Sequence, residues 1–174
     1  LLTDEDVTIR NFPDLLDVNK LIDLLISLGS EINWDKENKT ITINNSNLRK
    51  DFGEEGFPLG MRGAVLLLGP LAVRMDKIEV KTEIGGCSLG IRELDPHIDV
   101  LRSLGAEIKT NHHLIIDTSK GLRGGSIWPD YMSVTTTENF IMAASKANGI
   151  SEMTNAASEP HVQDLCNFLN QMGA

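Results

Sequence analysis

The sequence of 174 residues has little of several features that mark common classes of protein. Two cysteines are too few for a disulfide framework, which predicts a reducing compartment. Aromatic residues make up 5%, too few for a surface that stacks single-stranded bases. Sixteen lysines and arginines stand against 25 acidic residues, and the net charge of -9 argues against a nucleic-acid partner. A small anionic substrate is not excluded, because a few arginines can set a local field.

Long hydrophobic runs and targeting signals are also missing. The longest apolar run, residues 64–73, is about half of the ~20 residues that a membrane span needs, and it contains Gly69 and Pro70. The first residues carry acids where a signal peptide would carry basic and then apolar residues. We therefore expect a cytoplasmic protein without membrane insertion. No HExxH, CxxC or Walker spacing occurs, so the sequence predicts neither a metal site nor a P-loop.

Hydrophobic residues are abundant enough, at 41%, for the core of one globular domain. Within it, three segments share a pattern, in which an amphipathic helix ends at a glycine. The segments are 17–32, 96–108 and 160–174. The glycines are Gly29, Gly105 and Gly173, and glycine suits the left-handed conformation that often follows a helix.

The residues around these helices repeat as well. Two strands around a polar turn are predicted after Gly29 and again after Gly105. An apolar helix and a strand are predicted before the second and the third amphipathic helix. These pairs are 61–73 with 76–81, and 137–148 with 150–157. The repeated unit is therefore helix, strand, helix and two strands, with the apolar helix buried and the amphipathic helix nearer the surface.

We expect an α/β fold of three such units, at about 1–58, 59–134 and 135–174. The first unit is expected to lack its apolar helix, and the third to lack its two final strands. The sequence also begins with leucine rather than methionine. We therefore expect a segment of a longer protein, cut at both ends, in which a site shared with neighbouring segments is incomplete.

One loop, residues 83–97, carries residues suited to chemistry. Its glycines allow close approach of a ligand, with Cys87 among them and Arg92 five residues later. An arginine or a helix N-terminus lowers the pKa of a nearby thiol and makes it a better nucleophile or proton donor. An arginine can also bind phosphate or carboxylate through two hydrogen bonds. The alternative is that Cys87 is a small buried residue in a turn.

Residues along essentially the whole chain resemble the UDP-N-acetylglucosamine enolpyruvyl transferase (1-carboxyvinyltransferase) family. The matching stretches are the opening segment, 61–64, 85–92, 99–108 and 155–174. The Gly-Gly-Cys…Arg loop is specific to this branch, because the related shikimate-pathway enolpyruvyl transferases lack the loop cysteine. The resemblance implies two similar domains, each built from three repeated α/β units with helices inside and sheets outside. Residues 1–174 would then form most of one domain.

The resemblance also implies a reaction. The enolpyruvyl group of phosphoenolpyruvate passes to the 3′-hydroxyl of UDP-N-acetylglucosamine, phosphate is released, and the product enters peptidoglycan synthesis. No metal or cofactor is implied, and the second domain of the same chain is the implied partner. Two alternatives stay open. One is a non-catalytic paralogue that binds a sugar nucleotide or a partner, and the other is an enolpyruvyl transferase with a different acceptor.

The family's functional residues can be carried onto this sequence. Cys87 matches the loop cysteine that donates a proton, forms an adduct with phosphoenolpyruvate and is alkylated by fosfomycin. Arg92 matches the arginine that holds the phosphate of phosphoenolpyruvate, and Arg62 matches one that contacts the substrates on closure. Two segments match the nucleotide site, and in the second Ser133 is expected to meet the diphosphate near a helix N-terminus. The residues are Arg92, Glu93, Leu94, Asp95 and Pro96, and Tyr131, Met132, Ser133 and Val134.

Several positions around the expected nucleotide pocket differ from the family pattern. Glu93, Tyr131 and Thr135 replace a usual proline, lysine and glycine. These replacements favour the non-catalytic paralogue. Cys87 and Arg92 are intact, which favours the phosphoenolpyruvate chemistry.

The remaining candidate residues fit structural roles better. Cys166 lies at helical spacing among apolar residues and is expected in the core. His97 and His161 begin helices at equivalent positions of the repeat, which suggests structure over catalysis. Glu138 is expected to favour a helix N-terminus through its charge, whereas Asn139 could face the sugar.

Overall fold

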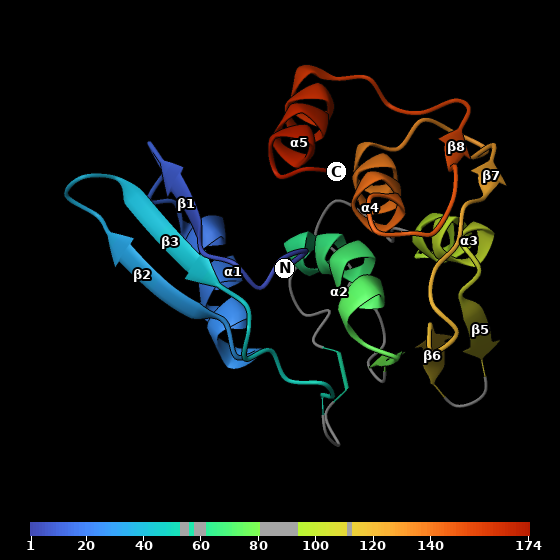
Figure 1. Ribbon diagram of the computed structural model, residues 1–174, viewed down its shortest axis with the longest axis horizontal. Coiled ribbons are helices and arrows are strands. Elements are labelled where there is room, and N and C mark those ends of the chain that lie inside the picture. The colour runs from blue at the N-terminus through green and yellow to red at the C-terminus, as the bar shows by residue number, and fades with distance from the viewer. Residues whose placement is uncertain (53–55, 58–61, 81–93, 111–112) are drawn as a thin grey trace.

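The computed structural model describes residues 1–52, 56–57, 62–80, 94–110 and 113–174. Two small antiparallel sheets lie on opposite sides of a group of central helices (Figure 1). This arrangement confirms the expected α/β fold with apolar helices inside and sheets outside. No helix among the described residues is long and apolar enough to cross a membrane.

The first unit forms a three-stranded sheet with one helix. Its elements are β1 (Val7–Arg10), α1 (Leu16–Ser27), β2 (Glu31–Asp35) and β3 (Thr40–Asn44). The strand order is β1-β3-β2, and both pairings are antiparallel, with Ile43 opposite Val7 on one side and Ile32 on the other. Successive side chains of a strand point to opposite faces, so Ile41 is fully buried while Thr40 and its other neighbour are only partly covered.

The second unit repeats this sheet. Its elements are η2 (Arg62–Leu67), α2 (Leu68–Arg74), β4 (Lys77–Val80), α3 (Asp95–Ser103), β5 (Glu107–Thr110) and β6 (Leu114–Asp117). The strand order β4-β6-β5 is antiparallel throughout and matches the first sheet strand for strand. The contact after each amphipathic helix repeats too, because Arg49 N donates to Leu28 O and Arg123 N donates to Leu104 O, both at 2.9 Å. The predicted repeat is therefore confirmed in these two units.

The third unit differs from expectation in detail. Its elements are α4 (Val134–Ala144), β8 (Glu152–Met153) and α5 (Pro160–Gln171), and the short strand β7 (Ser126–Ile127) precedes them. The expected strand at 150–157 is only the two residues of β8, and it pairs in parallel with β7. Two residues are too few to show an alternating pattern, so β7 is not predicted by the sequence. The expected helix at 137–148 begins at Val134 instead, because Ser133 caps it.

The helix expected at 61–73 is two helices of different kinds. A 3-10 helix runs over Arg62–Leu67, and an α-helix follows over Leu68–Arg74. Pro70 has no N–H to donate, yet as the third residue of α2 it lies in a first turn, where no intrahelical bond is lost. The first five residues of α2, from Leu68 to Ala72, are all buried, as the apolar sequence predicted.

Glycines end all three amphipathic helices as predicted. Gly29, Gly105 and Gly173 have φ of +98°, +94° and +90°. In each case the glycine N–H donates to the carbonyl three residues back, and the next N–H donates to the carbonyl five residues back. These paired bonds form the Schellman motif, which satisfies the last carbonyls of the helix.

Replacement of Gly29 by alanine is expected to destabilise the protein more than the same change at Gly121. Both glycines have positive φ, which costs an L-residue about 1–2 kcal/mol. A Cβ at Gly29 would also lie 2.5 Å from the backbone oxygen of Asn47, whereas nothing lies within 4 Å of one at Gly121. The free energy of unfolding in urea measures both variants. Equal losses would mean that the contact with Asn47 relaxes without cost.

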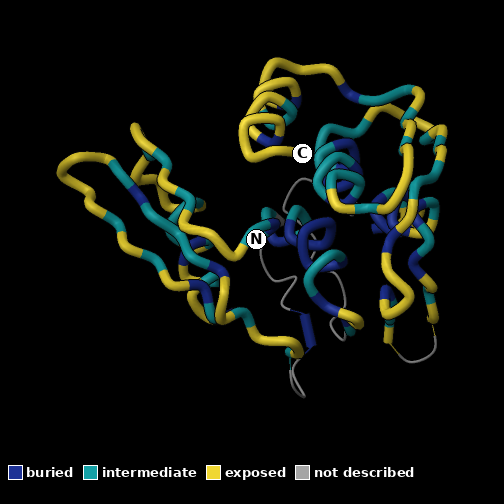
Figure 2. Tube along the Cα trace, viewed as in Figure 1, coloured by how far each residue is buried: buried dark blue, intermediate teal, exposed yellow. Residues whose placement is uncertain are grey.

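The main hydrophobic core lies where α2 and α3 pack against the second sheet on one side and against α4 on the other (Figure 2). Its fully buried side chains include Leu68, Leu71, Ile78, Val100, Leu101, Leu104 and Ile116. Helix α1, by contrast, buries only Ile22 and leaves Leu16 and Ile26 exposed. The core is therefore centred on the second and third units.

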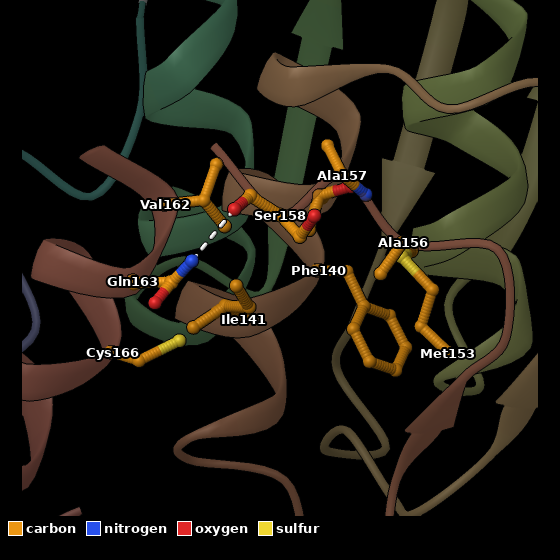
Figure 3. Close-up of a pocket in the computed structure, with 10 residues that line it drawn as sticks. Phe140, Ile141, Met153, Ala156, Ala157, Ser158, Val162, Gln163 and Cys166 are labelled. Carbon is orange, nitrogen blue, oxygen red and sulfur yellow. Dashed lines mark hydrogen bonds between the residues drawn. The ribbon is translucent and has the colours of Figure 1, made fainter. Parts of the chain in front are cut away.

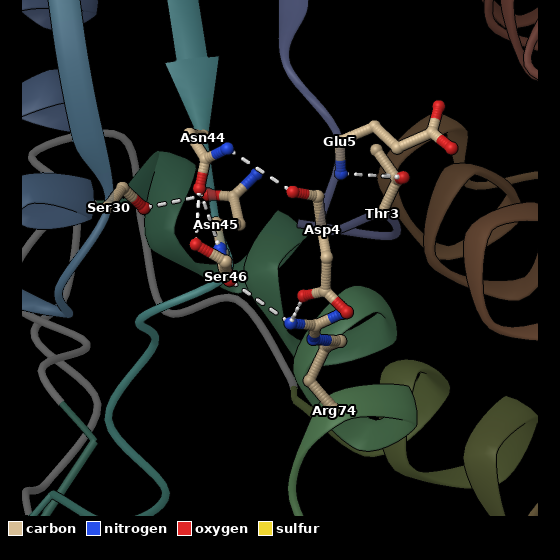
Figure 4. Close-up of polar contacts among 8 residues, drawn as sticks. All are labelled: Thr3, Asp4, Glu5, Ser30, Asn44, Asn45, Ser46 and Arg74. Atoms are coloured by element: carbon tan, nitrogen blue, oxygen red, sulfur yellow. Dashed lines mark hydrogen bonds and ion pairs between the residues drawn. The ribbon is translucent and has the colours of Figure 1, made fainter.

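A polar link joins the first unit to the last residue of α2 (Figure 4). The Arg74 guanidinium pairs with Asp4 and donates to Asn45 O at 3.0 Å. Asn45 is buried, and its Oδ1 accepts a hydrogen bond of 2.8 Å from Ser30 Oγ. The hydrogen bond from Arg74 lowers the pKa of the Asp4 carboxyl below its ordinary value. This link connects α2 with one end of the first sheet, where β1 and β2 begin and β3 ends.

Candidate functional site

The structure does not describe the side chains that are expected to act on phosphoenolpyruvate. Cys87, Arg92 and Glu93 lie outside the described residues. Arg62 is the first residue of η2, and its side chain also lies outside the described part of the chain. The geometry of the candidate site therefore comes from the two segments expected to bind the nucleotide.

The first segment, Leu94 to Pro96, forms the start of α3. Leu94 is the N-cap residue, and its side chain is buried in the main core, so only its backbone is available to a ligand. Asp95 is exposed at the first helical position, where the helix dipole favours a carboxylate. Pro96 follows within the first turn, where its missing N–H costs no helical bond.

The second segment, Tyr131 to Val134, forms the start of α4. Tyr131 and Met132 are exposed, by 52% and 66%. Ser133 is the N-cap residue, and its Oγ accepts hydrogen bonds from Thr136 N at 3.3 Å and Thr136 Oγ1 at 2.9 Å. In both bonds Ser133 Oγ is the acceptor, so its own hydroxyl hydrogen can be donated to a ligand.

The electrostatics at the start of α4 suit an anion. A helix N-terminus carries partial positive charge and free N–H groups, and the first turn of α4 contains no acidic residue. Glu138 lies one turn further on and is half-buried. Burial raises the pKa of the Glu138 carboxyl, although His161 opposes the rise. Glu138 was expected to favour the helix N-terminus through its charge, but it lies beyond the first turn of α4, where the helix dipole acts most strongly.

The expectation that Asn139 could face the sugar is wrong, because its side chain is fully buried. Asn139 is fully buried in α4, and both polar atoms of its side chain are hydrogen-bonded. Its partners are Gly69 N, Val65 O and His97 Nδ1, each at 2.8 Å. An apolar surrounding on α2, α3 and α4 explains why an unpaired amide would be costly there.

His97 has the structural role that its position suggested. It lies in the first turn of α3, is 6% exposed, and bonds through Nδ1 to the Asn139 amide nitrogen. Because that amide can only donate, Nδ1 accepts and the hydrogen of the neutral ring is on Nε2. Burial lowers the pKa of His97 to about 4. His161, its counterpart in the repeat, is exposed.

A pocket of about 310 Å³ lies between α4, α5 and the chain that follows β8 (Figure 3). Its apolar lining includes Phe140, Ile141, Met153 and Val162. The lining residues include no lysine or arginine, so the pocket is not suited to a phosphate. Cys166 lines it from α5 and is partly exposed, which corrects its expected place in the core. Among the described residues, no group of three or more His, Cys, Asp or Glu side chains could hold a metal ion.

Comparison with known proteins gives this arrangement its family. The model of the family described as EPSP synthase (3-phosphoshikimate 1-carboxyvinyltransferase) matches residues 1–174. The chain belongs to the EPSP synthase family. Two solved structures share the family fold at identities that speak for the fold alone. The enolpyruvyl transferase NikO from Streptomyces tendae aligns with a TM-score of 0.79 and 18% identity over 99% of this chain and 40% of its own. The EPSP synthase from Acinetobacter baumannii aligns with a TM-score of 0.63 and 17% identity, over 93% of this chain and 38% of its own.

Curated members of the EPSP synthase family narrow the branch. Proteins named UDP-N-acetylglucosamine 1-carboxyvinyltransferase match the whole chain at 42% identity in Borreliella burgdorferi and 43% in Coxiella burnetii, in each case over 40% of the relative. The protein of that name from Helicobacter pylori is 40% identical over 99% of the chain and 41% of its own length. The chain therefore spans about two fifths of the length of these relatives, and the family resemblance found in the sequence is confirmed.

Sequence reasoning missed the joining role of Asn139 within this EPSP synthase family domain. The signal that could have found it is an asparagine directly before the apolar residues 140–144 of α4, since a polar residue buried among them needs partners. Which partners it has could not be read from the sequence, because they lie in other helices.

Proposed function

We propose that the protein containing this chain transfers the enolpyruvyl group of phosphoenolpyruvate to the 3′-hydroxyl of UDP-N-acetylglucosamine and releases phosphate. The observation that carries the proposal is the 42% identity, along the whole chain, with a protein named for this reaction. The Gly-Gly-Cys…Arg loop at 85–92, specific to that branch, supports it. The reaction belongs to peptidoglycan synthesis and takes place in the cytoplasm. It gives the protein a role in cell-wall formation, cell shape and cell division.

In this proposal residues 1–174 make up most of one domain, in units at about 1–58, 59–134 and 135–174. A second domain of the same chain completes the site. The share of about two fifths that the chain takes of its relatives supports this division. The 174 residues alone are expected to release no phosphate from the two substrates.

The proposed chemistry assigns three residues to phosphoenolpyruvate. The Cys87 thiol gives its proton to the methylene carbon, and the neighbouring carbon becomes cationic as the double bond is used. The sugar 3′-hydroxyl adds to that carbon and gives up its proton to a base. The bond to phosphate then breaks while the new methyl group loses a proton, which restores the double bond. Arg92 holds the phosphate throughout and stabilises its charge as it leaves, and Arg62 contacts the substrates on closure.

The proposed nucleotide site uses the starts of α3 and α4. Leu94 offers its backbone to the uridine, beside Asp95, Pro96 and the preceding Glu93. Ser133 and the first N–H groups of α4 meet the diphosphate, flanked by Tyr131, Met132 and Val134. Tyr131 stands where the family has a lysine, so the helix end and the arginines supply the positive charge. No metal or cofactor takes part in these steps.

Labelling by fosfomycin tests the proposal. The full-length protein is incubated with fosfomycin, with and without UDP-N-acetylglucosamine, and its peptides are analysed by mass spectrometry. We expect an adduct on Cys87 that forms faster with the nucleotide, and none on Cys166, which faces an apolar pocket without a phosphate-binding cation. A rate of labelling that is the same with and without the nucleotide would contradict UDP-N-acetylglucosamine as the acceptor. No adduct at Cys87 would contradict the proposed chemistry and favour a non-catalytic paralogue.

A further inference from the structure

The three segments expected to bind the substrates share one feature of the fold. Each lies at the start of a helix: Arg62 at η2, Leu94 to Pro96 at α3, and Tyr131 to Val134 at α4. The helices come from two different repeat units, so nothing in their local sequence sets their relative positions. A contact between the helices must do so.

The side chain of Asn139, in the second turn of α4, touches both of the other helical segments. Its Nδ2 donates to His97 Nδ1 at 2.8 Å, and His97 is two residues after Asp95 in the first turn of α3. The same Nδ2 donates to Val65 O at 2.8 Å, three residues after Arg62 in η2. One amide group therefore binds α4 to the first turn of α3 and to η2.

The bonds to η2 and α2 replace part of a helix. In an α-helix the N–H of Gly69 would donate to the carbonyl of Val65, four residues earlier. Instead Gly69 N donates to Asn139 Oδ1 at 2.8 Å, and Val65 O accepts from Asn139 Nδ2. The amide thus bridges the two groups at the point where the 3-10 helix becomes the α-helix. A side chain inserted in this way is a recognised cause of a change in helix direction.

The packing around this bridge leaves little room for another arrangement. A Cβ at Gly69 would lie 2.5 Å from the backbone oxygen of Asn139 and 2.8 Å from its Oδ1. Asn139 is fully buried, as are Leu68 and Leu71 beside it in the core. A helix that moved would leave a buried donor or acceptor unpaired, which costs more than the bond itself contributes.

We propose that Asn139 is a positioning residue for the substrate site. Its amide holds the first turn of α3 and the junction of η2 and α2 against α4, and so sets the spacing of the three segments that bind the substrates. It touches no substrate, because it is fully buried. This inference rests on the proposed function, since that proposal assigns the three segments to the substrates.

The chemistry of the contact selects the variants that test it. The site needs two donors and one acceptor from residue 139, which leucine lacks while it keeps a similar volume. At residue 97 it needs only an acceptor near Nδ1. Asparagine at that position can offer its Oδ1 there, whereas leucine cannot. Comparison of His97→Asn with His97→Leu thus separates the effect of the hydrogen bond from the effect of losing the imidazole ring. His97→Leu removes only one of the three hydrogen bonds of Asn139.

A control variant must lose a buried hydrogen bond elsewhere. Ser30→Ala removes the donor of the 2.8 Å bond to Asn45 Oδ1, which is buried in the first unit, and touches none of the three helix starts. It is expected to lower stability without moving the substrate segments. The melting temperature and the nucleotide affinity of Ser30→Ala together show how much binding is lost when stability alone is lowered.

The dissociation constant of UDP-N-acetylglucosamine, measured by calorimetry on the full-length protein, is the main readout. We expect Asn139→Leu to raise it about 10-fold or more, since small displacements of positioned groups weaken binding and catalysis strongly. His97→Leu is expected to raise it several-fold, while His97→Asn and Ser30→Ala stay near the wild-type value. If Asn139→Leu does not fold, the two His97 variants decide. Unchanged binding in Asn139→Leu, equal binding in both His97 variants, or an equal loss in Ser30→Ala would overturn the proposal.

Amide hydrogen exchange separates this inference from the proposed function. If the wild type binds no UDP-N-acetylglucosamine, the proposed function fails, and exchange then decides the role of Asn139. Faster exchange at the starts of α3 and α4 in Asn139→Leu and His97→Leu, but not in Ser30→Ala, would support positioning. Exchange that rises evenly over the whole chain would overturn it.

Discussion

Serine in place of Cys87 is expected to lower the turnover of phosphoenolpyruvate and UDP-N-acetylglucosamine by about 10²- to 10⁴-fold, the range that a placed general acid contributes. A serine hydroxyl has a much higher pKa than a thiol, so it gives up a proton to carbon far less readily. The change in volume is small, and binding of the nucleotide should be kept. Release of phosphate by the full-length protein measures the loss.

The second cysteine provides a matched control. Cys166→Ser makes the same atomic change on α5, at the edge of the apolar pocket beside Ile141 and Val162. We expect its turnover to stay near the wild-type value. If Cys87→Ser kept most of the wild-type turnover, the proton would come from another group, and Cys87 would be a small structural residue of its loop.

The free energy of unfolding is expected to fall as the pH drops from about 6.5 to about 4, because of His97. Burial lowers the pKa of His97 in the folded protein to about 4, below the 6.5 of an exposed histidine. Between these values the unfolded chain binds a proton that the folded protein does not, so stability rises with pH. The contribution is complete above pH 6.5 and is lost as the pH falls toward 4. Two and a half units correspond to roughly 3 kcal/mol.

Urea unfolding at several pH values, in the wild type and in His97→Asn, measures this contribution. Asparagine does not titrate, so the variant should show a flatter dependence of stability on pH between 4 and 6.5. Asp4 and Asp14 also have pKa values lowered by their hydrogen bonds, to Arg74 and to Asn19 and Lys36. Their stabilising effect is likewise lost at low pH, in both proteins alike. Identical slopes in the two proteins would show that His97 is protonated without cost in the fold.

The chemistry-bearing residues could be predicted from the sequence only through the family. Spacing alone left Cys87 open between a reactive thiol and a buried turn residue. The resemblance gave it a role, and the curated relatives confirm the resemblance. Ser133 is different, because a serine before an apolar helical segment is a local capping signal, and the structure has it as the N-cap of α4.

The wrong expectations concern residues whose surroundings come from distant parts of the chain. Cys166 has the spacing of a core residue, yet it lines a pocket, because the facing residues on α4 do not close over it. Residues 150–157 were predicted to be a strand, but the strand that forms there, β8, is only Glu152 and Met153, paired with β7. A strand needs a neighbour as well as a pattern.

The sequence was sufficient for the repeat and for the C-terminal ends of its amphipathic helices. Gly29, Gly105 and Gly173 act within a single turn, so the physical reason for each helix end is local. Only the tertiary structure decided the role of Asn139, whose amide meets groups 42, 70 and 74 residues away. Its hydrogen bonds depend on how three helices pack, and no pattern of neighbouring residues encodes which buried donor will meet which buried acceptor.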